Sequence, residues 1–153
     1  MMPTMLTRSV VYSLLMAAAA APALAALGGD VTSVEADRAR MKGALQTTYS
    51  ANYTVHEIQM PKLVVHEYVS LSGQVFAVSW RGEGVPDLQQ VLGTYYGPFR
   101  QAAAANGPHY NHHQLSVNTS DLVVVSSGHI HGYFGRAWVP GLLPQAFSLA
   151  EIN

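Results

Sequence analysis

Hydrophobic and polar positions alternate along three short runs between Tyr53 and Trp80, and these runs are rich in Val, Ile and aromatic residues. Met60-Pro61-Lys62 separates the first two runs, and Ser70-Leu71-Ser72-Gly73 separates the last two. Alternation of this kind, bounded by turn residues, is typical of strands joined by turns. We therefore expect a three-stranded antiparallel meander at the centre of a small sheet.

The dipeptide His-Glu occurs once in each of the first two runs. Pro61 cannot take the positive φ of a type I′ turn, so the loop between the runs is expected to exceed two residues. A symmetric loop from Met60 to Leu63 would place His56 opposite Glu67 and Glu57 opposite His66. We interpret these residues as cross-strand pairs, each contributing only ~0.2–1 kcal/mol; the alternative is an acid–base site formed by all four.

The third run places large apolar side chains on one face, and we assign them to the core. These residues are Phe76, Val78 and Trp80. The composition of Arg81-Gly82-Glu83-Gly84 then predicts a turn that ends the meander.

Two segments have helical patterns. Thr32 and Glu35 have the spacing of a capping box, and Gly43 stands where a C-cap would, so residues 31–42 predict a short helix; an irregular arm is the alternative. A stronger pattern follows Asp87, where apolar residues recur at helical spacing and should pack on the sheet. They are Leu88, Val91, Leu92, Tyr95 and Phe99. Pro98 predicts a kink or break at Gly97.

Three more strands are expected over residues 113–117, 122–125 and 129–139, with turns at 118–121 and at Ser126-Ser127-Gly128. In the last run, one face holds Ile130, Gly132, Phe134, Arg136 and Trp138, and the other holds His129, His131, Tyr133 and Gly135. The pattern thus predicts an α+β fold, an antiparallel sheet of about six strands with two main helices on one face. The short pattern Ser-Gly-x-Val/Ile occurs before Trp80 and again before Trp138, and this repeat suggests two α-β-β-β units.

The first residues have the pattern of a secretory signal peptide. Arg8 precedes an apolar stretch, and Pro22 and Ala23-Leu24-Ala25 supply a helix break and a small-residue cleavage site. The apolar stretch is shorter than the roughly 20 residues that a membrane anchor needs. We expect residues 1–25 to be cleaved, leaving residues 26–153 as a single domain that is periplasmic or extracellular and has no membrane span.

Composition limits the partners of this domain. Without Arg8 the chain has seven Lys and Arg against nine Asp and Glu, and no basic patch, so nucleic-acid binding through phosphates is not expected. No cysteine is present, so no disulfide stabilises the fold after export and no lipid can be attached to a cysteine.

Histidine is the one compositional anomaly. Five of the seven lie in two clusters: His109, His112 and His113, and the pair His129 and His131. Residues two apart on a strand point the same way, so the pair could hold one Zn or Cu ion with a third ligand from the first cluster. The alternative is that all five are solvated polar residues, since their spacing matches no recognised metal site. We expect no other cofactor.

Several segments together resemble an exported proteobacterial family known as domain of unknown function 2844. The resemblance spans nearly the whole chain. It rests on Ala26-Leu27-Gly28-Gly29, Tyr53-Thr54-Val55-His56-Glu57, Glu67-Tyr68-Val69, the run from Gly73 to Trp80, Pro86-Asp87-Leu88, Leu92-Gly93, Asp121-Leu122-Val123-Val124, Gly128-His129 and the run from Gly135 to Pro140. It implies export and a single domain, and it supplies no activity, cofactor or partner.

The sequence contains no nucleophile elbow, phosphate-binding glycine loop or zinc-protease motif. We therefore expect a non-catalytic binding or interaction module of the cell envelope, whose partner is an envelope protein or a small ligand. A histidine-based metal-binding protein of the periplasm is the alternative. An enzyme built on His56, Glu57, His66 and Glu67 is the third hypothesis.

Overall fold

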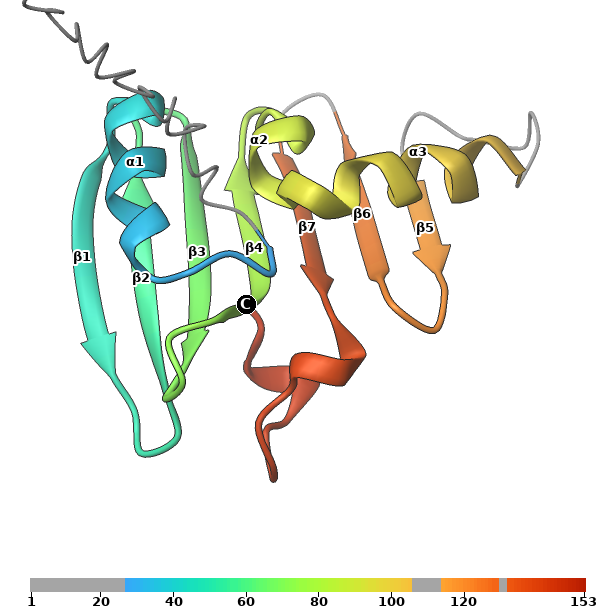
Figure 1. Ribbon diagram of the computed structural model, residues 1–153. Helices are drawn as coiled ribbons and strands as arrows, with labels where there is room; N and C mark the ends of the chain where they lie inside the picture. The colour runs from blue at the N-terminus through green and yellow to red at the C-terminus, as the bar shows by residue number, and fades with distance from the viewer. Residues whose placement is uncertain (1–26, 106–113, 130–131) are drawn as a thin grey trace, which may run out of the picture.

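A computed structural model describes residues 27–105, 114–129 and 132–153. These residues form one seven-stranded sheet in the order β1-β2-β3-β4-β7-β6-β5, and all neighbouring strands are antiparallel (Figure 1). In spatial order the strands are β1 (Ala44–Tyr49), β2 (Tyr53–Gln59), β3 (Leu63–Ser70), β4 (Val75–Gly82), β7 (Gly132–Trp138), β6 (Val123–His129) and β5 (Gln114–Asn118). The expected α+β class is confirmed.

The sheet consists of two meanders that meet where β4 pairs with β7. The first meander has four strands, one more than predicted, because β1 pairs with β2 at the edge of the sheet. Its sequence, Ala-Leu-Gln-Thr-Thr-Tyr, does not alternate between apolar and polar residues, as suits an edge strand that is exposed along most of its length. The register predicted for the β2–β3 hairpin is confirmed: His56 pairs with Glu67 and Glu57 with His66.

Three helices cover one face of the sheet: α1 (Thr32–Met41), α2 (Leu88–Leu92) and α3 (Tyr96–Ala105), with the 3-10 turn η1 (Gly93–Tyr95) between the last two (Figure 1). Val34 of α1, Val91 of α2 and Phe99 of α3 belong to the same buried cluster as Val78 and Trp80 of β4. Burial of this apolar surface is the main force that docks the helices on the sheet. We call this side the helix face.

The opposite side, which we call the open face, is only partly covered. The segment after β7, with the 3-10 turns η2 (Pro140–Leu142) and η3 (Leu149–Glu151), folds back onto it. Ile152 and Phe147 of this segment pack with Tyr68 and Phe76 in a second buried cluster. The sheet beyond this C-terminal segment has no helix over it in the part of the chain that the structure describes.

Phe76 corrects the assignment of a strand face. A register shift between Tyr68 and Val69 of β3 leaves Phe76 as an extra residue on β4. This bulge puts Phe76 in the open-face cluster, whereas Val78 and Trp80 lie in the helix-face cluster. Strict alternation was a wrong guide here because a bulge breaks the two-residue period.

The helix ends also differ from expectation. Val31 precedes α1 without a side-chain cap, and Lys42, with φ of 54°, ends it in the left-handed conformation expected of Gly43. The second helical region breaks at Gly93 instead of Gly97. Pro98 lies in the first turn of α3, where the N–H that proline lacks would have no helical partner, so no kink is needed.

Two predicted turns overlap with strands, one of them completely and the other in its first two residues. Ser126, Ser127 and Gly128 are residues of β6, and β7 begins only at Gly132. Arg81 and Gly82 are the last residues of β4. Small and charged residues favour turns, but here neighbouring strands on both sides supply the backbone hydrogen bonds. Among the described residues, no helix is long and apolar enough to cross a membrane.

Candidate functional site

Two arginines lie on neighbouring strands of the open face. Arg81 of β4 pairs with Phe134 of β7, and Ser79 of β4 pairs with Arg136 of β7. Residues two apart on a strand point to the same side, so Arg81, Phe134 and Arg136 project together from the sheet. The two arginines are therefore diagonal neighbours, with the exposed Phe134 ring beside them.

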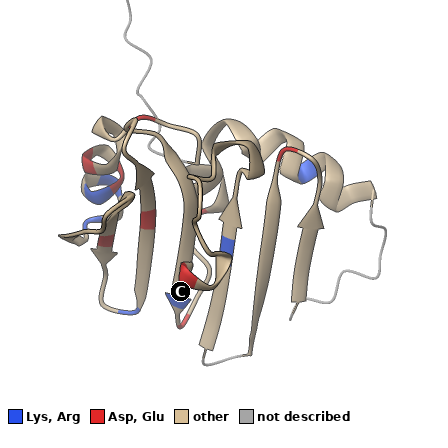
Figure 2. Ribbon diagram, turned by 90° about the horizontal axis from the view of Figure 1, so that it is seen from below, with Lys and Arg blue, Asp and Glu red and all other residues tan. Residues whose placement is uncertain are grey.

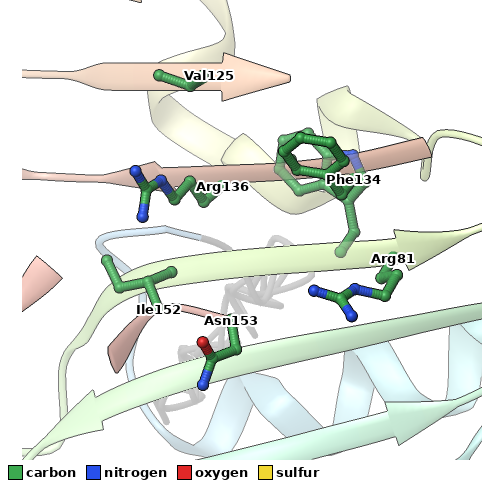
Figure 3. A pocket seen from close by; sticks show the side chains of 8 residues that line it. Arg81, Val125, Phe134, Arg136, Ile152 and Asn153 are labelled. Atoms are coloured by element: carbon green, nitrogen blue, oxygen red, sulfur yellow. The ribbon is translucent and has the colours of Figure 1, made fainter. Parts of the chain in front are cut away.

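These side chains border a pocket of about 290 Å³. Figure 3 shows Arg136 and Phe134 on one side of it, Ile152 and Asn153 on the other, and Arg81 at one end. The complete lining is Trp80, Arg81, Val125, Phe134, Gly135, Arg136, Ile152 and Asn153. Sheet and C-terminal segment each contribute walls, so the pocket exists only because this segment folds back.

Neither arginine of the pocket has a carboxylate within 4 Å among the described residues. Arg136 donates from Nη1 to the Leu149 carbonyl at 3.2 Å, and its guanidinium carbon lies 5.6 Å from the centre of the Trp138 ring. By contrast, Lys62 pairs with Glu83 at 2.7 Å. Figure 2 shows that charged residues are sparse on the sheet and that α1 carries residues of both signs.

A second hollow of about 510 Å³ adjoins the first and shares Arg81 and Asn153 with it. It is also lined by Glu57, Val64 and His66. Nε2 of His66 lies 3.0 Å from a Glu57 carboxylate oxygen, and Nδ1 lies 3.1 Å from the Asn153 main-chain oxygen. His66 thus ties the hairpin to the C-terminal segment at the edge of the pocket.

His56 and Glu67, in contrast, project from the helix face. Nδ1 of His56 lies 3.0 Å from the Thr47 hydroxyl, and burial lowers the pKa of this histidine. Glu67 is 1% exposed. Because His56 and Glu67 lie on the helix face and Glu57 and His66 on the open face, the four residues do not form one site. The hypothesis of an enzyme built on all four is wrong, and the reason is the two-residue period of the strand.

Glu67 instead lies next to Asp37 of α1, a residue that the sequence alone did not indicate. Each of the two carboxyl groups affects the pKa of the other, and we infer that they share a proton. Burial raises the pKa of Asp37 to about 6, against the opposing effects of Gln90, Glu67 and the charge of Arg40. Burial, together with the neighbouring charge of Asp37, raises the pKa of Glu67 well above its ordinary value. Gln90 of α2 donates to Asp37 Oδ1 at 2.7 Å.

The predicted metal ligands lie mostly outside the described residues. This holds for His109, His112, His113 and His131, so their arrangement stays a prediction. His129 is the last residue of β6 and pairs with Gly132, the first of β7. The single strand expected over residues 129–139 was wrong, because β6 ends at His129 and its antiparallel neighbour β7 begins at Gly132. Within the described ranges, no three His, Asp, Glu or Cys residues are grouped to hold a metal.

The pocket residues were present in the sequence but were not recognised as a site. Phe134 and Arg136 were placed on one strand face, whereas Arg81 was assigned to a turn. Their juxtaposition depends on β4 pairing with β7, two strands about fifty residues apart in the chain. The available signal was an arginine close to each of the two tryptophans, Arg81 after Trp80 and Arg136 before Trp138.

The comparisons with known proteins give a family and no function. A family model described as a protein of unknown function, DUF2844, matches residues 23–152. No curated protein and no solved structure matches the chain.

Proposed function

The chain belongs to the DUF2844 family of proteins of unknown function, and we propose that it is a non-catalytic binding module of the cell envelope that takes a small ligand in the pocket of its open face. The observation that carries this proposal is the pocket bordered by Arg81, Phe134 and Arg136. Pockets of about 300 Å³ and more, with apolar walls and a few polar groups, are typical ligand sites.

Phe134 supports this interpretation. Its side chain is 54% exposed although it lies near the middle of the sheet, between β4 and β6. An aromatic ring left in water on a central strand forgoes the stabilisation that burial would give it. A bound ligand would cover this surface.

A binding role also fits the chemistry of the polar groups. The Glu57–His66 pair is bound to the C-terminal segment through Asn153, and Glu67 and Asp37 are buried beneath α1. A general acid or base must reach its substrate within hydrogen-bond distance. The buried pair offers no such access, so we assign it a structural role.

The envelope location is supported by the signal-peptide pattern of residues 1–25. It predicts that the chain, expressed in a bacterium, appears in the periplasmic or secreted fraction and starts at Ala26 or Leu27. Fractionation with mass spectrometry tests this, and recovery of the uncleaved chain in the cytoplasm would contradict it.

A fragment screen by ligand-observed NMR tests the pocket. We expect aromatic and aliphatic fragments to bind the wild-type protein and to lose binding in Phe134→Ser. Leu71→Ser is the matched control, because Leu71 is also a large apolar residue, 76% exposed, but lies in the β3–β4 loop. Fragments that bind both variants equally, or no binding fragment at all, would contradict the proposal.

A further inference from the structure

We propose that the open-face pocket selects a monoanionic organic acid, whose carboxylate binds Arg81 and Arg136 and whose apolar body lies against Phe134, Val125 and Ile152. This inference rests on the proposed function, because it names the chemical class of ligand for the same pocket.

Arg81 and Arg136 are diagonal neighbours that project from adjacent strands on one face. In the described residues no Asp or Glu carboxylate lies within 4 Å of either guanidinium. An anion in the pocket would therefore be attracted by two positive charges that no acidic side chain neutralises.

The two guanidinium groups also offer free hydrogen-bond donors. A guanidinium has several N–H groups in a planar fork that fits a carboxylate. Arg136 uses one of them on the Leu149 carbonyl, which fixes the side chain and leaves other donors available. The Trp138 ring beneath this guanidinium restricts it further. Arg136 is thus held in place before any ligand arrives, which lowers the entropic cost of binding.

The apolar part of the wall favours an organic acid over an inorganic anion. Apart from Asn153, the other side chains at the pocket are apolar, among them the exposed Phe134 ring, Val125 of β6 and Ile152 of the C-terminal segment. The volume of about 290 Å³ corresponds to roughly ten water molecules at about 30 Å³ each. That space accommodates a short aliphatic or aromatic body in addition to a carboxylate.

A nearby carboxylate limits the negative charge that the ligand can carry. Glu57 lines the hollow that adjoins the pocket at Arg81. A second negative charge on the ligand would lie near this carboxylate, and repulsion between them would offset the attraction of Arg81. A single negative charge therefore fits the surroundings better than the double charge of a phosphate monoester.

Isothermal calorimetry with hexanoate, 1-hexanol and inorganic phosphate tests the inference. We expect hexanoate to bind and hexanol and phosphate to bind much more weakly. Arg81→Gln and Arg136→Gln should each weaken hexanoate binding on the order of tenfold. Arg100→Gln on α3 is the control, since this exposed arginine lies on the helix face, and it should leave binding unchanged. Thermal melting of each variant verifies that it is folded.

The outcomes separate this inference from the function on which it rests. Equal binding of hexanoate and hexanol, unaffected by either arginine variant, would overturn the anion inference and leave a neutral-ligand pocket. Phosphate binding as tightly as hexanoate would overturn the role given to the apolar wall. If neither hexanoate nor hexanol binds and the fragment screen is also negative, both the inference and the proposed function are wrong.

Discussion

Among single residues, Glu67 shows how far the chemistry of a side chain depends on its surroundings. Its neighbour in sequence, His66, lies on the open face within reach of Glu57, whereas Glu67 is buried opposite Asp37 of α1. Oδ2 of Asp37 and Oε2 of Glu67 receive no hydrogen bond from any other described group. A proton shared between them supplies the missing donor and removes one of two adjacent buried charges.

This pair predicts an unusual pH dependence of stability. A carboxyl group with a raised pKa in the folded state holds its proton more tightly when folded, so its contribution is present at low pH and is lost as pH rises through that pKa. For Asp37 the change from 3.8 to about 6 corresponds to on the order of 3 kcal/mol, lost as the pH rises from about 4 to about 6. Arg40 and His56, which pairs with Glu67 across the hairpin, also face this region. Their effects are therefore part of the free energy of unfolding that is measured at each pH.

Glu67→Gln tests this prediction. The amide of the variant can donate to Asp37 at every pH, so we expect higher stability than wild type at pH 8 and a flatter curve from pH 4 to 8. Urea unfolding across this range measures the effect. Glu83→Gln, which alters the exposed pair with Lys62, should follow the wild-type curve. A wild-type protein that gains stability steadily from pH 4 to 8 would contradict the shared proton.

Gly135 supports the pocket from beneath. A Cβ atom at this position would lie 2.7 Å from Trp80 Nε1 and closer still to two carbons of the ring. Gly135→Ala is therefore expected to lower the free energy of unfolding by about 1–3 kcal/mol through overpacking. Gly132→Ala on the same strand, where a Cβ would contact nothing within 4 Å, should change it little. Thermal unfolding of the two variants gives the comparison, and equal melting temperatures would contradict it.

At the level of elements, the C-terminal segment determines whether the open face has a pocket. The Phe147 ring lies 4.8 Å from that of Phe76 and 5.1 Å from that of Tyr53, edge to face in both cases. The Asn153 N–H donates to the Tyr68 hydroxyl at 3.0 Å. These contacts attach the segment to β2, β3 and β4, and so place Ile152 and Asn153 at the pocket.

Phe147→Ala is expected to loosen this segment alone. Loss of the partly buried ring should cost about 2 kcal/mol and accelerate amide hydrogen exchange at Ile152 and Asn153. Exchange in α1, on the other face, should stay unchanged. Leu149→Ala is the control, because this residue of the same segment is 38% exposed and its carbonyl still accepts from Arg136. Unchanged exchange at Asn153 in Phe147→Ala would show that other contacts hold the segment.

Elements with strong alternation could be predicted from the sequence, and weakly patterned ones could not. The β2–β3 register followed from Pro61 and the two His-Glu pairs. β1 was missed because its sequence does not alternate between apolar and polar residues, and β6 was shortened because Ser126 and Ser127 suggested a turn. The bulge at Phe76 is created by pairing with β3 and has no local sequence signal.

For the whole molecule, the asymmetry between the two faces of the sheet is the main result. Helices bury one face, and the C-terminal segment buries only part of the other. The sequence predicted helices on a single face, which implied an exposed opposite face. It could not predict the pocket, because Arg81, Arg136 and Ile152 come together only through the β4–β7 pairing and the return of the segment.

Chemical-shift mapping with hexanoate locates the binding site on the protein. Backbone ¹H–¹⁵N spectra of the wild-type protein are recorded as hexanoate is added. If the open-face pocket is the ligand site, the shifts should concentrate on Arg81, residues 134–136 and residues 152–153, with α1 and β1 unaffected. Saturable shifts centred on the helix face, or shifts scattered without saturation, would contradict the account.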